Sequence, residues 1–269
     1  MRWAVATLFT LWPALGQDPV DIVRRSLDRD MSNFEHLKDY TYQQREENRQ
    51  FDNAGKLKKS ESETREILIL GGRPYERLIA RNDQPLSEKE SAKEQERMDR
   101  VLERRQNLSE AEKARMEKRR AENRKYLREL PDAFHFKLVG EESISGKPAW
   151  IIAAEPKPDY HPKDIQAKLL SKMRGKIWVD KGEYQWVKVE AEVLDTISLG
   201  LALFRVAPGG SMSFEQTRVN DEVWLPAHIH VRADARIGYV KKMHAEIEVS
   251  YRDYKKFQSD SRIVTAEDK

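Results

Sequence analysis

The sequence predicts an α+β protein in which short helices and a charged helical hairpin cover one strongly curved antiparallel β-sheet. Polar and apolar residues alternate through most of the second half of the chain, which is typical of strands that bury one face only. Several of these strands span 9–16 residues, and long consecutive strands curl because β-sheets twist. A stretch without Gly or Pro, residues 87–130, interrupts this pattern with helical periodicity.

The composition of the 269 residues excludes several classes of protein. Charged residues make up 35% of the chain, which is too many for a polytopic membrane protein. Cysteine is absent, which excludes a disulfide framework, a thiol nucleophile, an iron–sulfur cluster and a cysteine zinc site. The 49 Lys and Arg exceed the 46 Asp and Glu by only three, so charge alone does not indicate nucleic-acid binding. We expect no cofactor.

The first 16 residues have the pattern of a secretory signal peptide. Arg2 supplies the positive charge, and residues 3–11 form an apolar run that is too short to span a bilayer. Ala14 and Gly16 place small residues at a cleavage site. No Cys follows the apolar run, which excludes a lipid-anchored lipoprotein. We therefore expect an exported, soluble protein of the periplasm, in which residues 17–269 form a single domain.

The first predicted element after this segment is a helix over residues 18–33. Asp18 followed by Pro19 favours a helix start. One face of the helix is apolar and carries Val20, Ile22, Val23, Leu27 and Met31. From Leu37 the period changes to two, and turn sequences at 52–55 and 71–74 divide the chain into a three-stranded meander.

The charged insertion, residues 87–130, contains 14 basic and 11 acidic residues, an excess equal to that of the whole chain. Two Ser-x-x-Glu capping boxes, which begin at residues 87 and 109, predict helices over 87–106 and 110–129. The apolar stripe of each helix is thin, and the heptad pattern is not sustained. The insertion is therefore expected to form a solvated helical hairpin rather than a coiled coil.

The remainder of the chain is nearly all β-structure. Its predicted strands are 134–142, 147–155, 175–179, 184–194, 198–206, 211–219, 222–236 and 239–254, with a short helix at 163–173. The alternation is clearest in 222–236, where every second residue from Val223 to Ala235 is apolar. The opposite face of that strand carries His228 and His230.

Short motifs in a fixed order carry a resemblance to a known family. They are Tyr-Thr-Tyr at 40–42, Gly-Lys-Pro-Ala-Trp-Ile-Ile at 146–152, Gly-Lys-Ile-Trp-Val-Asp at 175–180, Tyr-Gln-Trp-Val-Lys-Val at 184–189 and Val-Trp-Leu-Pro at 223–226. With the signal peptide and the first helix, they make the sequence resemble the periplasmic lipoprotein-sorting proteins, that is, outer-membrane lipoprotein carriers and related lipoprotein-binding sensor domains. The resemblance implies an unclosed β-barrel with helices as a lid over an apolar cavity that takes acyl chains. The insertion at 87–130 is much larger than the family's usual connection.

The resemblance implies a non-enzymatic binding protein that holds a lipid or a lipoprotein acyl chain in the concave face of the sheet. Lipoprotein sorting, a transport function in outer-membrane biogenesis, is the process it implies. The alternative is an envelope sensor or structural module that binds a protein partner through the charged insertion. We expect at most peripheral contact with a membrane and, because the chain is exported, no nucleic acid.

The candidate ligand-binding residues are apolar and lie on the short helix or on the inward face of the strand at 222–236. They are Leu169, Leu170, Met173, Ala227, Ile229, Ala233 and Ala235. The small Ala side chains would leave room for a ligand, or would let a helix approach the sheet closely. The helical residues would line the mouth of a cavity, or would belong to the core.

His228 and His230 lie two residues apart on one strand face, a spacing that can bind a metal if Asp234 or His244 adds a third ligand. That face is the polar one, and no H-E-x-x-H pattern accompanies it. We therefore expect exposed histidines, no metal site and no catalytic residue. A hydrolase that uses the two histidines is a third hypothesis.

Overall fold

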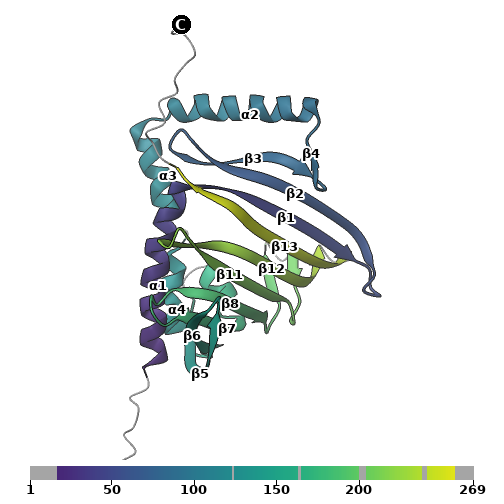
Figure 1. Cartoon of the computed structure of the whole chain (residues 1–269). Helices are drawn as coiled ribbons and strands as arrows, with labels where there is room; N and C mark the ends of the chain where they lie inside the picture. The colour runs from purple at the N-terminus through teal and green to yellow at the C-terminus, as the bar shows by residue number, and fades with distance from the viewer. Residues whose placement is uncertain (1–16, 123, 163–164, 200–203, 238–240, 258–269) are drawn as a thin grey trace, which may run out of the picture.

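A computed structural model describes residues 17–122, 124–162, 165–199, 204–237 and 241–257, and in these ranges the strands form one antiparallel sheet (Figure 1). The strand order is β4-β3-β2-β1-β13-β12-β11-β8-β7-β6-β5, with β10 paired to β12 and β9 paired to β10. The sheet curves strongly, and its outermost strands β4 and β5 do not pair with each other. The predicted fold class, an unclosed antiparallel sheet with helices, is confirmed.

Helix α1, Pro19–His36, runs along one side of the sheet and is followed by a single 3-10 turn, η1, Leu37–Asp39 (Figure 1). The helix begins as predicted, because the Asp18 side chain accepts a hydrogen bond from the backbone N–H of Val20. Its apolar face buries Ile22, Val23 and Leu27 against the sheet. None of the described helices is long and apolar enough to cross a membrane.

The meander predicted after the first helix is confirmed. Its strands are β1, Tyr40–Phe51; β2, Leu57–Leu70; and β3, Arg73–Arg81; the two-residue β4, Gln84–Pro85, extends it. Strand β13, Lys241–Lys256, pairs with β1, so the last described strand lies beside the first. The alternation of polar and apolar residues suggested that one face of each strand would be buried. In β1, however, every residue after Tyr40 is partly exposed.

The insertion forms two helices, α2, Glu88–Gln106, and α3, Glu110–Glu122, which diverge at the sheet edge near β3 (Figure 1). The capping box at Ser87 is present, as predicted. The second helix ends seven residues earlier than the predicted boundary at 129. A 3-10 helix η2, Lys125–Glu129, and a short α4, Leu130–Ala133, follow it. The chain turns here because Leu127 and Leu130 enter the core.

The other elements are β5, Phe134–Ile144; β6, Lys147–Pro156; α5, Ile165–Leu170; β7, Met173–Asp180; β8, Trp186–Val193; β11, Ser211–Val219; and β12, Val223–Ile237. The single strand predicted at 198–206 is wrong. Two short strands, β9, Ile197–Leu199, and β10, Phe204–Val206, pair with each other instead. Strand β11 pairs with β12 only as far as Arg232. Beyond that point β10 supplies the backbone hydrogen-bond partners for residues 235–237 of β12.

The main core lies where α1, η2 and α4 cover the β5–β8 half of the sheet. It contains Ile22, Val23, Leu27, Leu127, Leu130, Ala133, Phe134, Trp150, Ile152, Ala154, Ile177 and Val179. Part of the charged insertion therefore covers the apolar side of the sheet, while α2 packs on β3. Burial of each of these aliphatic or aromatic side chains contributes about 1.5–3 kcal/mol to the free energy of folding. This half of the sheet therefore contributes much of the stability of the fold.

Candidate apolar binding site

A cavity of about 210 Å³ lies between the inner face of the sheet and the segments η2, α4 and α5. Strands β5 to β8 and β11 form its floor, and almost all the side chains that face it are apolar. Its lining includes Tyr126, Leu127, Leu130, Phe134, Phe136, Leu170, Met173, Ile177, Val189, Ala191, Met212 and Phe214. In a chain that is 35% charged, this concentration of apolar side chains marks the best site for an apolar ligand.

The register of the sheet explains why the floor is hollow at this place. Ile177 pairs with Val189, and Gly175 pairs with Ala191, so a row of large side chains lies next to a row of small ones. A Cβ atom at Gly175 would collide with the backbone carbonyl of Glu190. The close approach of β7 and β8 thus requires Gly at this position, and its missing side chain leaves space above the sheet.

The structure brings two of the seven predicted ligand-binding residues to this cavity, Leu170 and Met173. Leu169, the third residue of that group, is partly exposed and does not belong to the lining. Whether any of them binds a ligand stays a prediction.

The four predicted residues of β12 lie outside the cavity lining. Ala227 falls at a bulge, because Glu215 and Gln216 pair with His228 and Pro226. Ile229 is the partner of Phe214 on the same face, one strand beyond the lining. Ala233 pairs with Ala245, and Ala235 is buried where Val206 and Met243 pair with it. Whether these four residues bind a ligand or serve packing stays a prediction.

Sequence reasoning missed the aromatic part of the lining. Phe134 and Phe136 alternate on β5, and Met212 and Phe214 alternate on β11. This period-two signal was available, but the two pairs of residues are more than 70 positions apart in the sequence. Only the pairing of β11 with β8 brings the two sets together.

A buried polar network fixes α1 and η2 next to the cavity. Asp30 on α1 has a side chain that is 6% exposed and forms an ion pair with Arg124, which comes just before η2. The Trp186 indole N–H donates to the other carboxylate oxygen of Asp30 at 2.5 Å, and Gln216 Nε2 lies 3.4 Å from that oxygen. Arg124 also stacks on Phe34, with its guanidinium carbon 4.3 Å from the ring centre. The cavity wall at Tyr126 and Leu127 is therefore tied to the sheet through Arg124.

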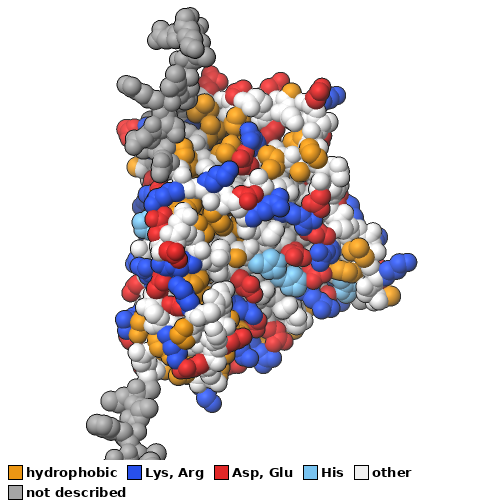
Figure 2. Space-filling view, in the orientation of Figure 1, with side chains coloured by type: hydrophobic (Ala, Val, Ile, Leu, Met, Phe, Trp, Pro, Cys, Tyr) orange, Lys and Arg blue, Asp and Glu red, His pale blue; other side chains and the backbone are white. Residues whose placement is uncertain are grey.

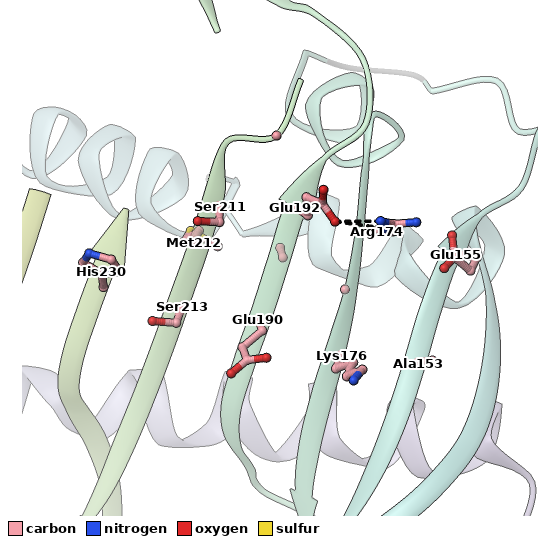
Figure 3. A pocket seen from close by; sticks show the side chains of 13 residues that line it. Ala153, Glu155, Arg174, Lys176, Glu190, Glu192, Ser211, Met212, Ser213 and His230 are labelled. Carbon is pink, nitrogen blue, oxygen red and sulfur yellow. Dashed lines mark hydrogen bonds and ion pairs between the residues drawn. The ribbon is translucent and has the colours of Figure 1, made fainter. Parts of the chain in front are cut away.

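The opposite face of the same strands carries a larger but open polar groove of about 700 Å³ (Figure 3). Lys176, Glu190, Ser213 and His230 form a row across four strands there. In the next row Arg174 donates to Glu192 at 2.8 Å. The ionic side chains and the openness of this groove make it unsuited to an apolar ligand.

The predicted histidine pair belongs to a network of charged residues on this outer face, where pale-blue histidines lie among acidic and basic side chains (Figure 2). His228 Nε2 lies 3.2 Å from Glu248, and His230 Nε2 lies 2.5 Å from Glu246. The hydrogen bond from His228 lowers the pKa of the Glu248 carboxyl. The two candidate third ligands, Asp234 and His244, instead pair with each other at 2.7 Å. No group of three acidic or histidine side chains in the described ranges could hold a metal ion.

Comparisons with known proteins return structural similarity only. No protein-family model matches the sequence, and no curated protein matches it. A putative outer membrane lipoprotein-sorting protein domain from Vibrio parahaemolyticus is 12% identical, with a TM-score of 0.31 over 90% of this chain and 95% of that one. A LolA superfamily protein from Nitrosomonas europaea is 11% identical, with a TM-score of 0.32 over 89% and 93%.

The MucA/MucB complex of Pseudomonas aeruginosa contains a chain that is 11% identical, with a TM-score of 0.24 over 90% of this chain and 100% of that one. Lipoprotein-sorting domains are thus among the solved structures to which this chain is similar, and they are the class that its sequence resembles. The identities are low and the TM-scores are below 0.5.

Proposed function

We propose that the protein is a non-enzymatic binding protein that holds the apolar end of a lipid, or of a lipoprotein acyl chain, in the cavity under η2 and α5. The observation that carries this proposal is the nearly continuous apolar lining from Phe134, Met173 and Phe214. Each methylene transferred from water to such a surface contributes about 0.8 kcal/mol. Binding of this kind requires no catalytic group and no cofactor.

The size of the cavity limits what it holds without rearrangement. At about 210 Å³ it exceeds an apolar cavity of about 150 Å³ that stays dry and binds benzene. It therefore takes a short hydrocarbon segment, and a longer acyl chain requires α5 and η2 to move away from the sheet. Met212, which is 36% exposed, and the partly exposed Leu170 lie where such an extension would leave the cavity.

The place of action that we propose is the periplasm, and the process is the transfer of lipids or lipoproteins across it. This part of the proposal depends on the signal peptide predicted at residues 1–16, which lie outside the described residues. The apolar cavity is compatible with it, because a lipid needs cover from water while it crosses an aqueous compartment.

The test is a pair of substitutions on opposite faces of one part of the sheet. Ala191→Leu adds three carbon atoms on the cavity side, and Ala153→Leu adds them on the polar groove side, where Ala153 lies next to Lys176 (Figure 3). Binding of a dansyl-labelled fatty acid is expected to weaken by about tenfold or more in Ala191→Leu, because the added carbons occupy the space of two or three methylenes. Ala153→Leu should bind the probe as the wild type does.

Native mass spectrometry of protein purified from a periplasmic fraction provides the second measurement. We expect an amphiphile to co-purify with the wild type and to be reduced in Ala191→Leu. Absence of any co-purified amphiphile, together with absence of probe binding by the wild type, would overturn the proposed function.

A further inference from the structure

The positive charge of the chain is concentrated in one short segment. Residues 113–128, which cover most of α3 and of η2, contain eight Lys and Arg but only two Glu. The other 253 residues contain 41 Lys and Arg against 44 Asp and Glu. Without this segment the chain would carry a small negative charge, so the segment is the region best suited to bind an anionic partner.

One side of the segment is occupied by contacts with the rest of the fold. Arg73 of β3 donates to the Met116 sulfur at 2.8 Å and to the Lys113 carbonyl at 3.3 Å. Arg73 also lies 3.6 Å from Glu117, so it compensates the charge of this acidic residue. At the other end Arg124 is held by the buried Asp30. These contacts determine which face of α3 points to solvent.

The outward face of α3 is basic. Arg115, Lys118 and Arg119 fall on it at helical spacings of three and four residues, and all three are exposed. None of the ion pairs between described residues involves them. Beyond the helix Lys125 and Arg128 are also exposed, and Glu122, which lies 3.8 Å from Lys125, adds one negative charge. We call these five cations the basic face.

The basic face and the apolar cavity belong to one continuous segment. Along η2, Lys125 and Arg128 flank Tyr126 and Leu127, which line the cavity. Cations on the solvent side of η2 are thus one residue away from the wall of the proposed lipid site. A surface that met Lys125 and Arg128 would lie next to this wall.

We propose that the basic face docks the protein on the surface of an anionic lipid bilayer, and that this contact places the cavity wall beside the membrane that supplies or receives the acyl chain. The choice of a bilayer over a nucleic acid rests on the proposed function, because an acyl chain has to come from a membrane. The attraction is electrostatic and peripheral, since the exposed face of α3 lacks the broad apolar stripe of an inserted amphipathic helix.

The test compares two matched triple variants of the full chain. Arg115→Gln/Lys118→Gln/Arg119→Gln removes three cations from the basic face. Lys93→Gln/Arg100→Gln/Arg104→Gln removes one Lys and two Arg from one exposed face of α2, so it changes the net charge equally. Binding is measured by co-sedimentation with vesicles of phosphatidylcholine alone and of phosphatidylcholine with phosphatidylglycerol.

We expect the wild type to bind only the vesicles that contain phosphatidylglycerol, and to lose this binding at about 1 M salt, where the Debye length is about 3 Å. Each basic residue near an anionic surface contributes about 1 kcal/mol, so the α3 variant should bind about a hundredfold more weakly. The α2 variant should stay within about threefold of the wild type. Circular dichroism should show the same folded spectrum for all three proteins.

Three outcomes would overturn the inference: equal binding of the wild type to both kinds of vesicle, equal weakening in the two variants, or tighter binding of the wild type to duplex DNA than to anionic vesicles at the same salt. Binding of the dansyl fatty acid without vesicles tests the proposed function separately. That binding should be unchanged in both variants, so loss of docking and loss of lipid binding are distinguishable.

Discussion

Asp30→Asn tests whether the polar network under α1 holds η2 against the sheet. The wild-type carboxylate accepts from Arg124 at one oxygen and from the Trp186 indole N–H, at 2.5 Å, at the other. An Asn amide has a single acceptor oxygen, so in either orientation its NH₂ group faces a donor, Arg124 or Trp186. The substitution conserves volume and therefore isolates the electrostatic and hydrogen-bond contribution.

The expected loss follows from the burial of the network. Asp30 is 6% exposed and Arg124 is 28% exposed at their side chains, so water replaces the lost contacts poorly. Removing a charge-assisted hydrogen bond and leaving its partner unsatisfied at such a site costs about 3 kcal/mol. That is a large fraction of the 5–15 kcal/mol that is typical for the free energy of unfolding.

The assay is urea unfolding followed by tryptophan fluorescence, to which Trp186 in the network contributes. Asp28→Asn, on the exposed side of α1, is the matched control and should change the free energy of unfolding by less than about 0.5 kcal/mol. Asp30→Asn should lower the urea midpoint at an unchanged slope. A loss below about 1 kcal/mol, or equal losses in the two variants, would refute the assigned role of the network.

Two further predictions concern the sheet. Gly175→Ala should lower the free energy of unfolding by about 2 kcal/mol, because the new Cβ meets the Glu190 carbonyl and β8 has to shift. Thermal unfolding measures this loss. An unchanged midpoint would contradict the close approach of β7 and β8 at Gly175. Hydrogen bonds from Arg49 and Ser60 lower the pKa of the Glu47 carboxyl from 4.5 to about 2. Glu47 therefore stabilises the fold above pH 4.5, and this contribution is lost as the pH falls towards 2. Urea unfolding from pH 7 to pH 2.5 measures the difference in the free energy of unfolding between the wild type and Glu47→Gln. This difference should become smaller as the pH falls. A difference that stays constant would refute the contribution assigned to the Glu47 carboxylate.

Local signals predicted most elements of the fold correctly. The Asp18-Pro19 start, the capping box at Ser87 and the turn sequences between β1, β2 and β3 act over a few residues, and each was found at its predicted place. The strand predicted at 211–219 has the bounds of β11. Such signals are reliable because the hydrogen bonds that they report are made within the segment itself.

The errors occurred where distant partners decide the local structure. Helical periodicity continued to residue 129, but the burial of Leu127 and the ion pair of Arg124 with Asp30 ended α3 at Glu122. The split of the strand predicted at 198–206 depends on the edge of β12 that β11 leaves open. Neither partner is visible in the local sequence.

The same distinction applies to the candidate site. Residue types alone indicated an apolar, non-catalytic interior, and they indicated that the charge is concentrated in the insertion. Only the tertiary structure decided which apolar residues face one cavity, because strand register brings Phe136, Val189 and Phe214 to one floor from three distant parts of the chain. It also decided that cations of the insertion flank this cavity, since contacts of Arg73 and Arg124 orient α3 and η2. Sequence patterns specify which side chains avoid water, whereas long-range pairing specifies which of them meet.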